Sequence, residues 1–418
     1  MTKLSLDQAP VVSLPRRFLL SMPIWGLMAS ALLLMDGDAL LRSRWYPGTL
    51  ALVHTYTLGV LGNAMFGSLL QFLPAAGGMS LRGTSLGVSM HVVFNAGTAF
   101  LVYGLYESSD GALMVASLLL PMAFACLLGM TLPGLWHTLG QRLLRMGLGV
   151  ALGAAGVAAL LGATIALGLS GSLGSAIPAW VDVHASVAIV GWMLVLLASV
   201  GRVVMPMFQG TSVPDERWQG VWLGCLLVLL AVLAFWRLRG PAGTGLGLLA
   251  AGSGLSFAAA VVWLQRKTPQ GRRGPLWWSW RTGTSVLALS AVMMAINARD
   301  GMLAGVLAIG VAVPMLVLGM GLEIVAFLGW IELHRRVGRG VRLPGVQRLM
   351  PARHRTAVWM IQLGAAIPLV LATCCPTPWV ARAAGIMEGT AWLVVTGVFI
   401  GTRRRVERFA RTGTLGVA

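Results

Sequence analysis

Two histidines, His54 and His184, lie in similar apolar surroundings far apart in the chain. Each follows a valine and precedes a long apolar stretch, which ends at Pro74 after His54 and at Pro206 after His184. A glycine follows each proline within a few residues. The two stretches therefore indicate a weak internal repeat that places one histidine at the start of each copy.

An imidazole inside a membrane needs a partner for each of its ring nitrogens. Two histidines at one depth on separate helices provide the two axial ligands of a haem iron, with the porphyrin wedged between the helices. The alternative is that His54 and His184 each hydrogen-bond to a neighbouring helix or to interfacial water. Their spacing alone leaves both interpretations open.

Two further side chains are candidates for chemistry inside the apolar part of the chain. His91 is expected near the opposite face of the membrane, either in a second site or as an interfacial histidine with its hydrogen bonds satisfied. Glu323 lies two thirds of the way along an apolar stretch, and a carboxyl group in such a place is a functional candidate by default. It fits a proton path, a protonated and hydrogen-bonded carboxyl, or a group that reaches the interface near Glu332.

Cys374 and Cys375 are adjacent at the expected outer end of an apolar helix. Vicinal thiols that face an oxidising compartment can bind copper or form a strained disulfide. No histidine is near them in the sequence, which weakens the copper interpretation. The four cysteines show no zinc-type spacing, and they are too scattered for a disulfide scaffold.

The composition places all these residues in a membrane protein. Of the 418 residues 57% are hydrophobic and only 11% are charged, and the mean hydropathy is +0.81. A soluble domain carries roughly 25% charged residues, so a water-soluble fold would have to expose large apolar patches. The composition excludes a soluble enzyme and also a disordered chain.

Apolar runs between charged residues predict an all-α bundle of about twelve membrane spans. Each run is far longer than the roughly ten residues of a barrel strand, so we expect helices. Spans 9 and 12 are the weakest, because the first is short and the second contains Arg382 and Glu388. The expected spans are 18–35, 50–74, 86–106, 112–133, 146–168, 181–204, 218–236, 242–265, 282–298, 302–328, 356–374 and 380–402.

The distribution of charge predicts the orientation of the bundle. With the N-terminus inside, 25 of the 31 Lys and Arg residues lie in inner segments and 6 in outer segments, as the positive-inside rule requires. We therefore expect both termini in the cytoplasm and a multi-pass protein of a bacterial inner membrane. In this orientation His54 and His184 both lie a short way below the outer surface.

The net charge of +18 is explained by this distribution, and nucleic acid is not an expected partner. The expected organisation is a cytoplasmic segment 1–17, one membrane domain 18–402 and a basic cytoplasmic tail 403–418. A basic inner loop, 335–355, is expected on anionic lipid head groups. The alternative is a docking site for a soluble partner.

The stretches HTYTLGVLG, which starts at His54, and QFLPAAGG, which starts at Gln71, resemble the first histidine-bearing helix of the NnrS family. They are also similar to the second helix of the haem-copper oxidase catalytic subunit. That resemblance implies twelve helices in three pseudo-repeats of four, and it implies that His54 holds a low-spin haem. The same role is assigned to His184 only because it lies four helices after His54.

The chain departs from that family in its histidines. An oxygen- or nitric-oxide-reducing subunit needs six histidines toward the outer side, whereas this chain has two there. It lacks the His-x-His pair on span 10 and the His-x-x-x-Tyr pair on span 6. If the resemblance holds, the chain is a non-catalytic relative without a binuclear centre.

Three functions remain open from the sequence. The first is a protein that binds haem b, with copper as a further cofactor, and transfers electrons or serves in a nitrogen-oxide or metal-stress response. A respiratory-chain protein would be its partner. The second is a cofactor-free transporter or permease, since helical repeats suit that class as well. The third is an assembly factor for a respiratory complex that docks through the basic inner loop.

Overall fold

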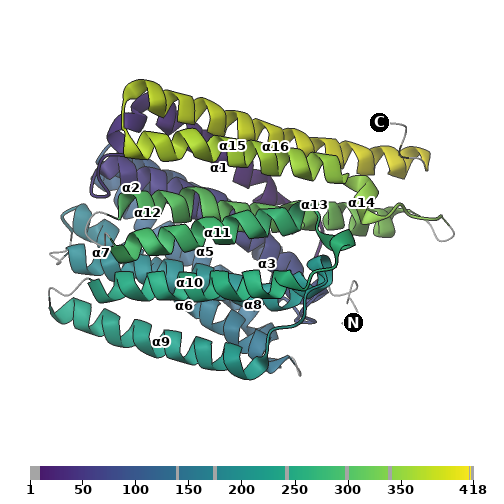
Figure 1. Cartoon of the computed structure of the whole chain (residues 1–418), viewed down its shortest axis with the longest axis horizontal. Coiled ribbons are helices and arrows are strands. Elements are labelled where there is room, and N and C mark those ends of the chain that lie inside the picture. Colours follow the sequence, from purple (N-terminus) through teal and green to yellow (C-terminus); the bar gives the residue numbers. More distant parts are fainter. Residues whose placement is uncertain are drawn as a thin grey trace.

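The computed structural model describes residues 10–137, 141–172, 177–240, 244–296, 301–337, 341–413 and 415. Within these ranges all regular structure is helical. The helices run side by side along the long axis of the molecule (Figure 1). The described residues thus confirm the predicted all-α class.

Twelve long helical segments follow one another, numbered here in chain order, and several combine α-helix with π-helix or 3-10 helix. Segments 1 to 6 are α1 (Ser13–Leu40); α2 (Pro47–His54) with η2 (Thr55–Gly62) and α3 (Asn63–Ala75); η3 (Thr84–Leu86) with α4 (Gly87–Tyr106); α5 (Asp110–His137); α6 (Arg142–Leu169); and α7 (Ile177–Ser186) with η4 (Val187–Leu194), α8 (Val195–Val204) and η5 (Met205–Gln209). Segments 7 to 12 are α9 (Glu216–Arg239); α10 (Thr244–Arg266); α11 (Pro275–Ile296); α12 (Met302–Gly305) with η7 (Val306–Ala312) and α13 (Val313–Arg336); α15 (Ala352–Cys374); and α16 (Pro378–Thr412), with the short η6 (Gln270–Arg272) before α11 and α14 (Val346–Leu349) before α15.

Eleven of these segments in the described part of the chain are long and apolar enough to cross a membrane. The exception is α11, which corresponds to the expected span 282–298 and packs against α10 and α13. Its first half contains Arg281 and several hydroxyl residues, which lower its apolarity. Residues 297 and 298 of that expected span, and residues 242 and 243 of the expected span 242–265, lie outside the described residues. The architecture is that of a polytopic membrane protein.

Large apolar side chains cover the outside of the bundle. Ile24, Leu118, Leu160, Val228 and Ile296 are each about half exposed or more, although they lie in the interior of long helices or at an apolar helix end. In water such a surface would be unfavourable, whereas in lipid it is the expected one. The exposed apolar surface agrees with a bilayer as the surrounding solvent.

The chain begins and ends at the same end of the bundle. Leu19 of α1 packs with Leu328 near the end of α13, and Leu333 of α13 packs with Phe409 near the end of α16. In Figure 1 this is the right-hand end, where α14 also lies. An even number of long segments that run back and forth along the bundle has this result. Because α16 continues to Thr412, the first ten residues of the predicted basic tail extend this helix.

Segments 2, 6 and 10 each contain a π-helix in the half of the bundle opposite the chain termini. These are η2, η4 and η7. A π-helical turn inserts an extra residue into the α-helical ladder and is frequent at functional sites. His54 is the residue before η2, and His184 lies three residues before η4. The residues before η7 include no histidine.

Candidate functional site: a histidine pair in an apolar cavity

The structure brings His54 and His184 together, although they are 130 residues apart in the chain. Their ring centroids are 6.2 Å apart, and the ring planes are inclined by 23°. His54 ends α2, and His184 lies in α7. The two residues for which the sequence indicated a repeat therefore face each other in space.

One nitrogen of each ring is held by a backbone carbonyl oxygen. His54 Nδ1 lies 2.7 Å from Leu50 O in its own helix, and His184 Nδ1 lies 3.0 Å from Ala158 O in α6. A carbonyl oxygen only accepts, so each Nδ1 carries the proton and donates. The lone pair of each imidazole is then on Nε2. Among the described residues neither Nε2 makes a hydrogen bond.

This arrangement is the one that metal-ligating histidines adopt. Such a histidine almost always donates its second ring N–H to a carbonyl, a carboxylate or water, which sets the tautomer and the ring orientation. The structure shows that donation for both His54 and His184. The His184 contact with Ala158 is also the bond to a neighbouring helix that the hydrogen-bonding alternative expected.

The two rings border an apolar cavity of about 400 Å³. Its walls come from segments 2 to 6, and Ile309 of η7 completes them. Phe124 and Trp192, which pack edge to face at 5.4 Å, contribute aromatic surface. The cavity thus combines apolar walls with two imidazoles, as ligand sites for large planar cofactors do.

Gly162 of α6 permits the close approach of this helix to His184. A Cβ atom at position 162 would lie 3.0 Å from Cε1 of the His184 ring and 3.8 Å from its Nε2. Any larger side chain at this position would therefore press on the imidazole.

The separation of the rings fits two ligands on opposite sides of one metal ion. Two metal–nitrogen bonds of about 2.0–2.1 Å each, extended to the centres of the two rings, give roughly 6 Å between the centroids. The rings are 6.2 Å apart. Among the described residues no three His, Cys, Asp or Glu side chains are grouped to hold a metal ion. A haem iron, which takes four of its six ligands from the porphyrin, needs only the two histidines.

Charged side chains lie beside the end of this cavity that is farthest from the chain termini. Asp182, two residues before His184 in α7, pairs with Nε of Arg237 at 2.9 Å and lies 4.0 Å from Nη1 of Arg44. The first pair connects α7 to α9. It holds the histidine-bearing turn in place and puts positive charge near the site.

His91 does not join this site. Its Nε2 lies 2.9 Å from the hydroxyl of Ser21, and its ring packs edge to face on Phe18 at 4.9 Å. A Cβ atom added at Gly87, one turn earlier in α4, would touch Leu14 at the beginning of α1. His91 is therefore at the end of the bundle that holds the chain termini, where the sequence placed it.

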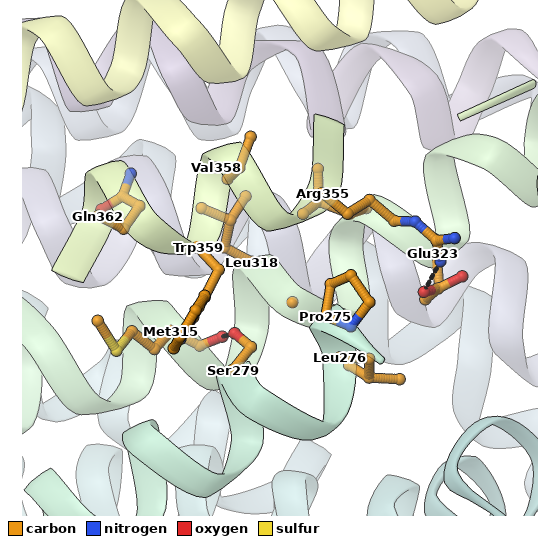
Figure 2. A pocket seen from close by; sticks show the side chains of 12 residues that line it. Pro275, Leu276, Ser279, Met315, Leu318, Glu323, Arg355, Val358, Trp359 and Gln362 are labelled. Carbon is orange, nitrogen blue, oxygen red and sulfur yellow. Dashed lines mark hydrogen bonds and ion pairs between the residues drawn. The ribbon is translucent and has the colours of Figure 1, made fainter. Parts of the chain in front are cut away.

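Glu323 forms a buried ion pair with Arg355, which the sequence did not predict. Both side chains are buried, with 4% and 5% of their surface exposed. Arg355 also donates to the side-chain oxygen of Gln347. Figure 2 shows the pair at one end of a small cavity between α11, α13 and α15. None of the three alternatives for Glu323 included an arginine partner.

Cys374 and Cys375 are both exposed and carry free thiols. They lie where α15 ends, opposite the chain termini. No disulfide joins them in the structure, and no third metal-binding side chain among the described residues is grouped with them.

Glu388 is a further carboxyl group buried in the bundle. From the sequence it counted only against the prediction of span 12. Glu388 of α16 is 3% exposed and lies beside Tyr56 of η2 and Trp392. The Tyr56 hydroxyl and the Trp392 indole N–H are buried and have no hydrogen-bond partner in the described part of the chain. The rule that an intramembrane carboxyl is a functional candidate, applied to every span, would have found Glu388.

Comparison with known proteins adds no relative. No model of a known protein family matches the chain, and no curated protein is significantly similar to it in sequence.

Proposed function

We propose that this chain is an integral membrane protein that binds one haem b, which His54 and His184 would hold. The observation that carries the proposal is the geometry of this pair. The two rings are 6.2 Å apart, both Nδ1 atoms are held by carbonyl oxygens, and both rings border one apolar cavity.

The proposed role is electron transfer. Haem supplies one-electron oxidation and reduction, and two histidine ligands leave no open coordination position for a substrate. The protein's own residues keep Nε2 of each histidine unprotonated, and the apolar walls exclude water from the site. The Asp182–Arg237 pair keeps the turn that carries His184 on α9.

We further propose that the chain is a distant, non-catalytic relative of the NnrS and haem-copper oxidase group. The recurrence of a π-helix in segments 2, 6 and 10 supports three pseudo-repeats of four helices. Segment 10 carries no histidine in its outer half, so a binuclear centre lacks its ligands. The role in respiration or in a nitrogen-oxide or metal-stress response rests on this resemblance.

The proposed location is a bacterial inner membrane with both termini in the cytoplasm. Support comes from the basic residues, which gather at the end of the bundle where the chain begins and ends. A membrane-impermeant maleimide added to intact spheroplasts should label Cys374 and Cys375, because both are exposed at the opposite end. If these cysteines were labelled only after lysis, the protein would have the opposite orientation to the one proposed.

The test of the haem site is a dithionite-reduced minus oxidised absorption spectrum of the purified protein, with a pyridine haemochrome assay on the same sample. We expect a sharp α-band, one haem per chain and the spectrum of haem b. His54→Ala and His184→Ala should each abolish the band.

His91→Ala is the matched control, since His91 belongs to a different contact with Ser21. It should keep the full haem content. A flat spectrum from folded wild-type protein without metal would overturn the proposal, and solute transport assays would then test the permease alternative.

A further inference from the structure

A second cavity, of about 300 Å³, lies in the half of the bundle that holds the chain termini. Its walls come from α3, α8 with η5, α11 and α13, with Val346 of α14 at its edge. Segments 2, 6 and 10 therefore border both cavities, one in each half of the membrane. We call this one the inner cavity.

The side chains that line the inner cavity are buried at its deep end, and some are more exposed toward the end of the bundle that holds the chain termini. Met65 and Leu196, at its deep end, are buried. Met207 is 41% exposed, and Phe327 and Val346 are partly exposed. A ligand can thus enter from the inner surface and extend toward the membrane midplane.

No residue that lines the inner cavity carries an ionisable side chain. A charged ligand would lose its hydration there without gaining an opposite charge, which is strongly unfavourable. The walls are made almost wholly of aliphatic, aromatic and thioether side chains. The cavity therefore selects uncharged ligands with a large apolar part.

Two polar side chains of the wall have no partner for their hydrogen-bonding groups. Gln71 is 3% exposed and Trp280 is 1% exposed. Neither the amide oxygen and nitrogen of Gln71 nor Nε1 of Trp280 makes a hydrogen bond to any described atom. Buried polar groups are nearly always paired, so these two groups point to a partner from outside the chain.

Both groups lie near the open end of the inner cavity. Gln71 is one turn before the end of α3, and Trp280 is less than two turns after the start of α11. An amide can donate and accept, whereas the indole N–H only donates. A carbonyl or hydroxyl group of a ligand would complement them, with its apolar body in the deep end.

We propose that the inner cavity binds one uncharged amphiphile, with its carbonyl or hydroxyl head group at Gln71 and Trp280 and its apolar body among segments 2, 6 and 10. The volume lies at the lower end of the range of small-molecule sites. Two sources in a membrane supply this chemistry, a short-chain or partly inserted quinone and a neutral glycerolipid. The inference is independent of the haem proposal.

Native mass spectrometry of the purified full chain, released from detergent micelles, counts the ligands retained on each chain. The probes are decylubiquinone, 1-decanoylglycerol and decanoate, which differ in head group and charge. We expect one saturable molecule per chain for at least one neutral probe and none for decanoate. The neutral probe that binds more tightly identifies the source.

Two variants test the place of binding. Gln71→Leu should weaken binding roughly five- to tenfold, the equivalent of one hydrogen bond. Val200→Phe should abolish binding, because it fills the cavity that Val200 lines. Gln362→Leu is the matched control, since the Gln362 amide nitrogen is also buried and unpaired but borders the small cavity of Figure 2.

Each outcome of these binding measurements either supports or overturns the proposed ligand site. Loss in Gln71→Leu and Val200→Phe but not in Gln362→Leu supports the proposal, and circular dichroism shows whether each variant is folded. Absence of saturable binding of both neutral probes to folded wild-type protein overturns it. Equal binding of decanoate, or an equal loss in all three variants, overturns it as well.

Discussion

Segments 2, 6 and 10 border both the cavity beside His54 and His184 and the inner cavity, and the two cavities differ in a few polar side chains. The cavity beside His54 and His184, called the outer cavity, has two imidazoles, each with one nitrogen held by a carbonyl oxygen and the other without a partner among the described residues. The inner cavity has an unpaired amide and an unpaired indole N–H. The apolar walls are alike, so the polar residues decide what each cavity can bind. The first set suits a metal, and the second suits a neutral hydrogen-bonding head group.

The largest expected effect is the complete loss of the ligand of one cavity while the ligand of the other cavity stays bound. His184→Ala should remove the haem α-band completely and leave decylubiquinone or 1-decanoylglycerol binding at its wild-type level. Val200→Phe should abolish binding of the neutral probes and keep the haem α-band at its wild-type level. Absorption spectra and native mass spectra of both variants measure this, and loss of both ligands in either variant would show that the cavities are not independent.

The next largest effect is a loss of folding stability when the buried ion pair between Glu323 and Arg355 is broken. Arg355→Met leaves the Glu323 carboxylate buried without its partner, so it should cost about 3–5 kcal/mol of unfolding free energy. Unfolding by sodium dodecyl sulfate in mixed micelles measures the change. Haem content per folded chain should remain that of the wild type, because the outer cavity is in the other half of the bundle.

The double variant Glu323→Leu with Arg355→Met is the control for this prediction. Replacing a buried ion pair by apolar side chains is often neutral or stabilising. The double variant should therefore recover most of the lost stability. Stability as low as that of Arg355→Met alone would mean that the arginine acts through Gln347 or another contact.

A smaller effect is expected from crowding the His184 ring. Gly162→Val places side-chain atoms against the imidazole, and strain of about 1–2 kcal/mol corresponds to a loss of roughly tenfold in haem affinity. Haem titration of the apoprotein measures it. Gly153→Val, in the same helix but with open space around its Cβ position, should bind haem normally.

The smallest effect is expected from a substitution in the hydrogen-bonded side chains that lie between the two cavities. Asn63 and Asn95 exchange two side-chain hydrogen bonds of 3.0 and 3.2 Å, and the Trp25 indole donates to Asn95 at 2.7 Å. Asn95→Leu should cost about 1–2 kcal/mol and change neither ligand's binding by more than a few fold. Thr98→Val should have little effect, since Thr98 donates only within its own helix.

The number and type of the helices were largely predictable from the sequence. Long apolar runs separated by basic residues have one stable arrangement in lipid, because every backbone group must be paired within the segment. Each expected span coincides with a long helix. The weak span 9 is a helix whose polar first half packs among its neighbours, which hydropathy alone does not detect.

The candidate site was predictable only in part. The similar contexts of His54 and His184 placed both histidines at one depth. The sequence could not show that Gly162 admits the His184 ring, nor that Ala158 supplies the carbonyl oxygen that sets its tautomer. It also gave no sign that Arg355 reaches Glu323.

Composition, apolar run length and charge placement are local properties, and they determined the solvent, the helical class and the expected orientation of this protein. The tertiary structure alone decided the 6.2 Å approach of the two imidazoles, the partner of Glu323 and the unpaired groups of the inner cavity. Each of these depends on which faces of distant helices meet. Close packing sets those faces through the sizes of many side chains at once, so no single motif encodes them.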